Sequence, residues 1–260
     1  MVAGEPFVEH TRRAEPGVLV EVCVEGVAGL RAARAAGARR VELCCALSEG
    51  GLTPSRALLE ACVAEGGVEV VVLVRPRGGD FLYDADELAV LERDVELARE
   101  AGAAGVALGC LTADGEIDAE SSARLIARAR PLAVAFHRAF DLVREPERAL
   151  EALVDLGVTR VLSSGQAASA FAGRARLGEL VRKARGRIAV IAAGGVRAEH
   201  ARELVRASGV RELHLSAAAR GASAMRFRNP EVRLGRAGEE FERWHTDEAA
   251  VRALVQALHA

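Results

Sequence analysis

The sequence predicts an α/β fold, a single (β/α)8 TIM barrel with a C-terminal helical extension. Short runs rich in β-branched residues recur along the whole chain, and amphipathic segments of helical period separate them. The repeat is about 30 residues, the size of one βα unit. Eight such units fill a chain of 260 residues, and a closed barrel is the most economical arrangement of eight parallel strands.

The strand-like runs are short and end in polar or small residues. They are Val18–Cys23, Arg40–Cys45, Val70–Val74, Gly105–Gly109, Leu132–His137, Arg160–Ser163, Ile188–Ala192 and Arg211–Leu215. The segments Asp86–Ala101 and Pro146–Leu156 show the helical period most clearly. Glycines stand at the ends of the expected helices, where a left-handed cap is favoured: Gly37, Gly67, Gly102, Gly157, Gly186 and Gly209.

A doubly wound open sheet is the alternative fold. The barrel is favoured because no Gly-x-Gly-x-x-Gly motif opens the first unit and no Gly/Pro/Ser-rich linker divides the chain. We therefore expect an N-terminal segment over residues 1–17 and one barrel domain over residues 18–260. Residues from Gly221 onward lie outside the eight units, and Asp247–His259 predicts a closing helix with Thr246 as its N-cap.

Composition excludes several classes of function. A net charge of -2, a pI near 6.3 and only 3% aromatic residues argue against a nucleic-acid partner. No apolar run approaches the ~20 residues that span a bilayer, and residues 1–17 lack the apolar region of a signal peptide. We expect a cytoplasmic protein with no membrane partner.

The five cysteines are odd in number and unevenly spaced, which argues against a disulfide framework. Each is a packing residue, a metal ligand or a nucleophile. Cys45 and Cys62 are expected to pack, and Cys110 is left open between packing and function.

The carboxyl ends of the expected strands carry most of the polar residues, and in a barrel these ends form one mouth. By alternation, Glu21 and Cys23 share one face of the first strand, and Glu42 and Cys44 share one face of the second. The opposite faces are apolar and suit the helix layer, so both Glu-x-Cys pairs point into the barrel. Inward carboxylates need partners, and we expect Arg75 and Arg77 to supply them. A purely structural ion cluster is the alternative role for Glu21.

Acid–base groups at the mouth are compatible with catalysis. The candidates for proton transfer are Glu42, His137, Asp141 and His214. Arg75 and Arg77 are expected to lie side by side on one strand face and to bind an anionic group. The further candidates for substrate binding are Ser164, Gln166, Gly194 and Gly195. A tight turn remains the alternative for the glycines, and an interior structural histidine remains the alternative for His214.

Several motifs together resemble the CutC family. They are Glu42-Leu-Cys, Leu47-Ser-Glu-Gly-Gly-Leu-Thr-Pro-Ser55, Arg75-Pro-Arg-Gly-Gly-Asp-Phe81, Phe136-His-Arg-Ala-Phe-Asp141, Ser164-Gly-Gln166 and Ala193-Gly-Gly-Val196. The resemblance covers about residues 18 to 235. Two positions depart from the family pattern: Ala193 replaces a glycine, and Leu215 replaces the glycine after His214.

The resemblance implies a cytoplasmic TIM barrel that forms a homo-oligomer, a dimer or tetramer, and takes part in copper homeostasis. It also implies that Cys23 and Cys44 contact copper, Cu(I). Thiolates are ligands that Cu(I) prefers, but buried cysteines also pack cores, and that alternative stays open. A barrel enzyme (hydrolase, lyase or isomerase) acting on a small anionic, possibly phosphorylated, compound is the second hypothesis, and a binding module is the third.

Overall fold

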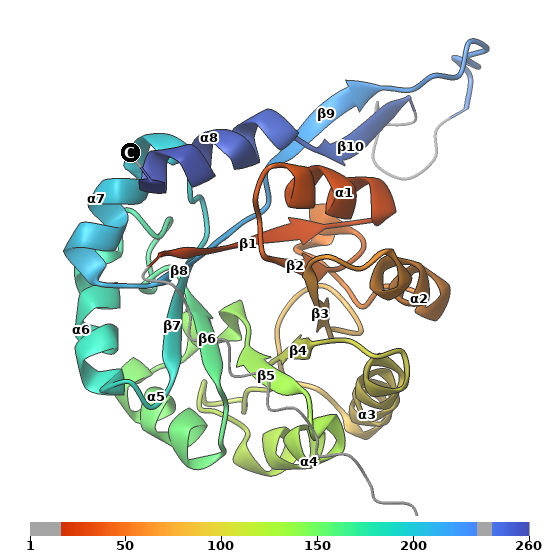
Figure 1. The fold of residues 1–260 in the computed structure, drawn as a ribbon. Coiled ribbons are helices and arrows are strands. Elements are labelled where there is room, and N and C mark those ends of the chain that lie inside the picture. Colours follow the sequence, from red (N-terminus) through yellow and green to blue (C-terminus); the bar gives the residue numbers. More distant parts are fainter. Residues whose placement is uncertain (1–16, 233–240, 260) are drawn as a thin grey trace, which may run out of the picture.

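The computed structural model describes residues 17–232 and 241–259. Eight parallel strands form a closed barrel in chain order, and β8 pairs with β1 to complete it (Figure 1). The strands are β1 (Leu19–Val24), β2 (Arg40–Leu43), β3 (Glu69–Leu73), β4 (Gly105–Leu108), β5 (Ala133–Phe136), β6 (Arg160–Ser163), β7 (Ala189–Ala193) and β8 (Glu212–Leu215). The predicted barrel is confirmed, with every strand inside or within one residue of its expected run.

A helix follows each of the first seven strands, and together these helices surround the barrel (Figure 1). They are α1 (Val27–Ala35), α2 (Arg56–Glu65), α3 (Ala85–Glu100), α4 (Ala119–Ala129), α5 (Pro146–Asp155), α6 (Arg174–Ala184) and α7 (Ala198–Ser208). Several carry the caps their sequence favours. The Asp84 side chain accepts from the backbone N–H of Glu87 and forms a capping box at the start of α3.

The alternation of side chains along the strands produces two separate cores. Val20, Val22 and Val24 pack outward into the layer between strands and helices. The inward faces form a smaller core inside the barrel, which contains Cys23 and Cys44. The predicted facing of these two cysteines is therefore confirmed.

The glycines expected to end helices all have positive φ, from 73° at Gly209 to 95° at Gly37. At Gly209 the left-handed conformation lets its backbone N–H donate to the carbonyl of Val205 at 2.8 Å, which ends α7.

The chain beyond β8 forms a hairpin and a closing helix. Strands β9 (Ala218–Ala222) and β10 (Glu242–Thr246) pair antiparallel and project from the barrel (Figure 1). This hairpin was not predicted. Helix α8 (Glu248–His259) confirms the closing helix and packs against α7 and α1.

The predicted N-cap of the closing helix is wrong. Thr246 is the last residue of β10, and Asp247 caps α8 because its carboxylate accepts from the backbone N–H of Ala250 at 3.1 Å. The N-terminal segment expected over residues 1–17 lies outside the described residues except for Gly17.

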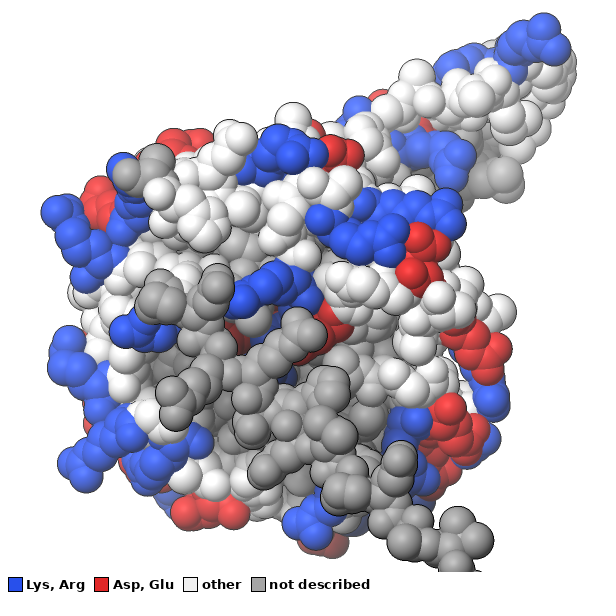
Figure 2. Space-filling model, in the orientation of Figure 1, with Lys and Arg blue, Asp and Glu red and all other residues white. Residues whose placement is uncertain are grey.

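Acidic and basic side chains alternate around the rim on the face that Figure 2 shows, and arginines gather on the projecting hairpin. Ion pairs join neighbouring helices, as between Arg128 of α4 and Glu92 of α3 at 2.7 Å. None of the helices within the described residues is long and apolar enough to cross a membrane.

Candidate functional site

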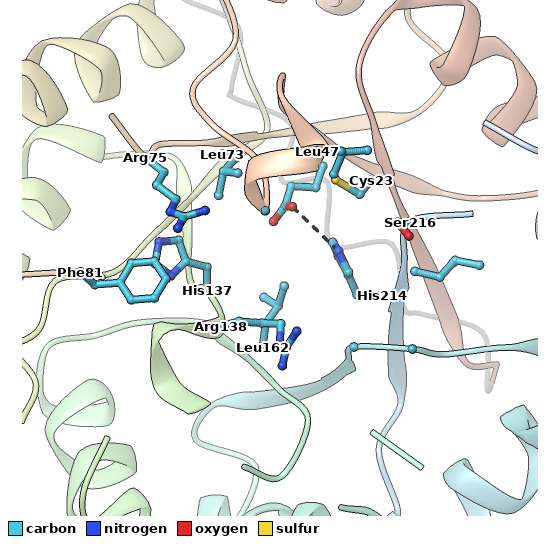
Figure 3. Close-up of a pocket in the computed structure, with 15 residues that line it drawn as sticks. Cys23, Leu47, Leu73, Arg75, Phe81, His137, Arg138, Leu162, His214 and Ser216 are labelled. Atoms are coloured by element: carbon cyan, nitrogen blue, oxygen red, sulfur yellow. Dashed lines mark ion pairs between the residues drawn. The ribbon is translucent and has the colours of Figure 1, made fainter. Parts of the chain in front are cut away.

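One pocket of about 270 Å³ opens at the carboxyl ends of the barrel strands. Seven of the residues predicted for the site line it: Cys23, Glu42, Arg75, His137, Gly194, Gly195 and His214. Figure 3 shows Cys23 and His214 on one side of the pocket and Arg75, Phe81 and His137 on the other. We call Cys23, Cys44, Glu42 and His214 the thiol wall. Arg75, His137 and Arg138 form the cation wall.

Cys23 and Cys44 bring their sulfurs together at the base of the thiol wall. Strands β1 and β2 are neighbours, and the two Sγ atoms lie 3.3 Å apart. Both residues are buried, and only Cys23 reaches the pocket lining. The hydrogen bond with Cys44, burial and the nearby charge of Glu42 raise the pKa of the Cys23 thiol well above its ordinary value. Cys23 is therefore a thiol at neutral pH until a ligand displaces its proton.

A chain of charged groups runs from the pocket into the barrel interior. The Nε2 atom of His214 lies 3.9 Å from Glu42 Oε2, the pair marked by the dashed line in Figure 3, and its Nδ1 lies 2.7 Å from Glu21 Oε1. Glu21 also accepts from Arg40, and Arg40 donates to Glu212. Each of these buried charges has at least one partner of opposite sign.

Burial and ion pairing shift the pKa values of these charged groups in opposite directions. Burial favours a neutral Glu21, but hydrogen bonds and charges from His214 and Arg40 lower its pKa to about 2. Burial raises the pKa of Glu42, and the charge of Glu21 adds to this effect, although His214 opposes it. Burial alone would lower the pKa of His214, but the carboxylates of Glu42 and Glu21 raise it overall. The two carboxyl groups thus favour the protonated form of His214.

The expected partners of the inward carboxylates are wrong. Glu21 pairs with Arg40 and His214, not with Arg75 or Arg77. The barrel register explains the difference, because Glu21 lies directly opposite Arg40 of β2. Arg75 lies beyond the end of β3 at Leu73, among the loops at the carboxyl ends of the strands.

Arg75 and Arg77 do not lie side by side, which corrects the expected pair of parallel guanidinium groups. Arg75 lines the pocket, whereas Arg77 turns outward to the side chains of Glu87 and Asp80 and stacks on Tyr83. The strand has already ended at Leu73, so strand alternation no longer fixes the direction of either side chain.

Asp141, Ser164 and Gln166 lie beside the pocket and not among its lining residues. The Asp141 carboxylate accepts from the backbone and hydroxyl of Ser164 at 3.0 Å, from Ser163 Oγ at 2.6 Å and from the backbone N–H of Gln166 at 3.3 Å. It also accepts from Arg138 Nε at 2.9 Å. This network fixes the loop after β6 and directs Arg138, whose guanidinium lies over Gly194.

Three residues that matter to the site were not assigned to it from the sequence. Arg40 shares the inward face of β2 with Glu42 and Cys44, so the same alternation could have identified it. Arg138 and Phe81 line the pocket from the loops after β5 and β3, where no periodicity indicates direction.

The remaining cysteines have packing or structural contacts. Cys62 of α2 and Cys110 after β4 belong to the outer core, which confirms the expected packing of Cys62 and assigns the open case of Cys110 to packing. Cys45 is half-buried and its thiol donates to the carbonyl of Thr53 at 3.1 Å.

Side chains on the thiol wall could hold a metal ion. One ligand atom each from Cys23, Glu42 and His214 lie within 4.8 Å of one another. His214 Nδ1 contacts Glu21, so its Nε2 faces the cluster, an arrangement that orients metal-binding histidines in many proteins. Sulfur, imidazole and carboxylate donors together suit a transition metal.

Comparison with known proteins decides the family. The CutC family profile matches residues 18–219. The chain belongs to the CutC family. A CutC family protein of Chromobacterium violaceum is 47% identical over 241 residues, covering 92% of this chain and 98% of the relative. The human copper homeostasis protein cutC homolog is 44% identical over 243 residues, covering 93% of this chain and 89% of the relative.

The CutC fold is also seen in solved structures. A crystal structure of a copper homeostasis protein CutC from Streptococcus agalactiae has a TM-score of 0.73 and 34% identity, covering 76% of this chain and 97% of that one. A phosphoribosylanthranilate isomerase from Thermotoga maritima has a TM-score of 0.57 at 14% identity, covering 93% of this chain and 98% of that one. The second likeness concerns the barrel fold alone.

Proposed function

We propose that this CutC barrel binds one Cu(I) ion between Cys23 and Cys44 and thereby takes part in copper homeostasis. The observation that carries the proposal is the 3.3 Å separation of the two sulfurs. Two thiolates can share one ion when their sulfurs are no more than ~4.6 Å apart, twice a typical metal–thiolate distance of ~2.3 Å. The human relative is also named a copper homeostasis protein.

The charges around the cysteines support Cu(I) as the cargo. Binding to two thiols releases two protons and leaves a bis-thiolate copper unit with a net charge of −1. His214, whose pKa is raised, lies in the same cluster as Cys23, and in its protonated form it offsets part of this negative charge. Glu42 faces Cys23 within the same cluster and is placed to accept a thiol proton as the ion enters.

An anaerobic Cu(I) titration in competition with a chromophoric Cu(I) chelator tests the proposal. We expect the double variant Cys23→Ser/Cys44→Ser to lose one site per chain. Cys45→Ser is the matched control, because it removes a neighbouring half-buried thiol that points elsewhere, and Cys62→Ser removes a buried one. Equal affinity in the double variant and both controls would exclude copper binding at the thiol wall.

Proton transfer on a small organic substrate is the second candidate function. The buried Glu42 carboxyl, whose pKa is raised, lines the same pocket as His214, and groups shifted in this way act as general acids and bases. Such an enzyme would be a lyase or isomerase.

Solvent exchange provides a general assay for this second function. Wild type and Glu42→Gln are incubated in D2O with a panel of sugar phosphates and oxo acids, and proton NMR follows loss of C–H signals next to carbonyl groups. We expect exchange that depends on Glu42 and persists in Cys23→Ser/Cys44→Ser, which separates it from copper binding. Absence of exchange across the panel, or equal exchange in Glu42→Gln, would count against proton transfer.

A further inference from the structure

The cation wall contains two buried hydrogen-bond donors without acceptors. Arg75 is 7% exposed and His137 is 5% exposed, and both line the pocket. Arg75 Nε and His137 Nε2 are fully buried side-chain nitrogens with no hydrogen-bond partner among the described residues. Unpartnered buried polar atoms are rare and costly, so each requires an explanation.

The local structure around His137 fixes its protonation. Its Nδ1 accepts from the backbone N–H of Ala139 at 3.2 Å, so the ring proton is on Nε2. Burial and the charge of Arg75 lower the pKa of His137 to about 3, which keeps the ring neutral at physiological pH. The Cε1–Nδ1 edge of the ring packs against Gly109, and the Nε2–H remains as the ring's donor without a partner among the described residues.

Arg75 is a buried cation without a carboxylate partner. Its terminal nitrogens donate to three backbone carbonyls, those of Glu49 at 3.0 Å, Gly51 at 3.1 Å and Gly79 at 2.8 Å. Across residues 17–232 and 241–259 it makes no ion pair. Carbonyl oxygens hold the guanidinium in place but leave its charge uncompensated, and a buried uncompensated charge favours an anion beside it.

The two donors belong to residues that pack against the same aromatic ring. The Phe81 ring packs against both residues, with its centroid 5.0 Å from Arg75 Cζ and 4.8 Å from the His137 ring centroid. Figure 3 shows the Arg75 guanidinium and the His137 ring directed toward one another. Arg138 adds a second guanidinium from the side of Gly194, where a Cβ would lie 3.1 Å from its Cζ. Two guanidinium groups and one neutral imidazole donor thus line this side of the pocket, and of the two cations only Arg138 has a carboxylate partner, Asp141.

We propose that the cation wall binds the oxyanion of a small molecule, a carboxylate or phosphate group, through the N–H donors of Arg75 Nε and His137 Nε2, with Arg138 as the outer cation. The proposal goes beyond copper binding, since none of these residues belongs to the cysteine cluster. The anion would be the substrate class of the proton-transfer function. Binding of the anion does not depend on that function, and only its conversion rests on it. The pocket of about 270 Å³ admits a molecule of metabolite size next to Glu42.

Two matched variants test the site at constant ionic strength. Arg75→Lys keeps the charge and removes the Nε donor, and Arg77→Lys makes the same change two residues away, outside the pocket. Inorganic phosphate and acetate are titrated separately by calorimetry against wild type and both variants. We expect at least one of the two anions to bind wild type and Arg77→Lys equally, and to bind Arg75→Lys at least tenfold more weakly.

A measurement on the wild type covers the case in which Arg75→Lys fails to fold. In ¹⁵N-labelled protein, the His137 Nε2–H resonance should shift on addition of the anion that binds, because Nε2 gains an acceptor. Binding of phosphate alone or acetate alone identifies the group that the site prefers. A water molecule as the permanent acceptor predicts no binding of either anion and no shift, and that result would overturn the proposal, as would equal affinities in the two lysine variants.

Discussion

The thiol wall and the cation wall face each other across one pocket, but their polar groups are satisfied in opposite ways. On the thiol wall every charge has a partner, from Glu42 through His214 and Glu21 to Arg40. On the cation wall the Arg75 charge has only carbonyl partners, and two donors have none. The charges of the first wall are thus paired within the described residues, although Arg40 Nη1 makes no hydrogen bond, whereas the charge of Arg75 on the second wall has no carboxylate partner there.

The two walls also differ in titration. The thiol wall consists of groups that exchange protons, a thiol, a carboxyl and an imidazolium, with pKa values of Cys23, Glu42 and His214 all raised. On the cation wall the one titratable imidazole, His137, stays neutral because its pKa is lowered to about 3. A wall that releases protons suits capture of a metal ion, and a wall of fixed charge suits recognition of an anion. One pocket can therefore serve both ligands without sharing residues.

The largest expected effect concerns the charged chain that supports the thiol wall. Glu21→Gln leaves the buried Arg40 with Glu212 alone, and breaking a buried pair from one side costs about 3 kcal/mol of the free energy of unfolding. Glu60→Gln is the control, since it breaks an exposed i,i+4 pair with Arg56 on α2. Urea denaturation should show a clear loss only for Glu21→Gln. Equal stability of the two variants would mean that the ion pairs do not hold this wall.

Copper affinity should increase with pH. Because the Cys23 pKa is raised, Cu(I) must displace its proton, and apparent affinity then rises about tenfold per pH unit for each proton released. The chelator competition repeated between pH 6 and 8 measures this slope. Glu42→Gln should change the slope, because Glu42 faces the thiol, while Arg77→Lys should not. A pH-independent affinity would show that the thiols are already deprotonated.

The pKa values of the two histidines are shifted in opposite directions, so each wall should contribute a different pH dependence to stability. The pKa of His214 is raised, so the stability it contributes is fully present below its ordinary pKa of ~6.5 and is lost as pH rises through its folded value. The pKa of His137 is lowered to about 3, so stability falls as pH drops below ~6.5, by up to ~1.4 kcal/mol per pH unit.

Nitrogen chemical shifts of the histidine side chains check both directions in one titration. At pH 6.5 His214 should be mostly imidazolium, and His137 should remain the neutral Nε2–H tautomer down to pH 5. Protonation of His137 above pH 5 would remove the argument that it acts as a neutral donor.

How far the sequence predicted this site depends on where each residue lies relative to a strand. Inside the strands the two-residue period fixes direction, which is why the inward placement of Cys23 and Cys44 was predicted correctly. Arg40 was equally predictable from its alternation with Glu42. Once a strand ends the period no longer applies, and Arg75 and Arg77 separate for that reason.

Long-range pairing was the other feature that the sequence did not reveal. The hairpin of β9 and β10 joins segments about twenty residues apart, and the Ala-rich strand Ala218–Ala222 has no alternation that indicates a sheet. The loop after β6 is similar, because Asp141 collects its donors from a distant part of the chain. Such contacts depend on the closed barrel and not on local sequence.

The smallest expected effect is that of Asp141 on anion affinity, and it tests whether Asp141 belongs to the cation wall. Asp141 lies outside the pocket and holds Arg138 through Nε, so Asp141→Asn should act on an anion only through the position of Arg138. We expect a two- to fivefold weakening of phosphate or acetate binding, less than for Arg75→Lys, because Arg138 is half exposed and water screens its charge.

The matched measurement is Cu(I) affinity, which Asp141→Asn should leave unchanged since no contact links Asp141 to the thiol wall among the described residues. Arg138→Ala provides the limit, and Asp141→Asn combined with Arg138→Ala should weaken the anion no further than Arg138→Ala alone. Additive losses in the double variant would instead assign Asp141 a direct role at the ligand. The loop after β6 would then belong to the pocket, and the cation wall would have to be extended to include it.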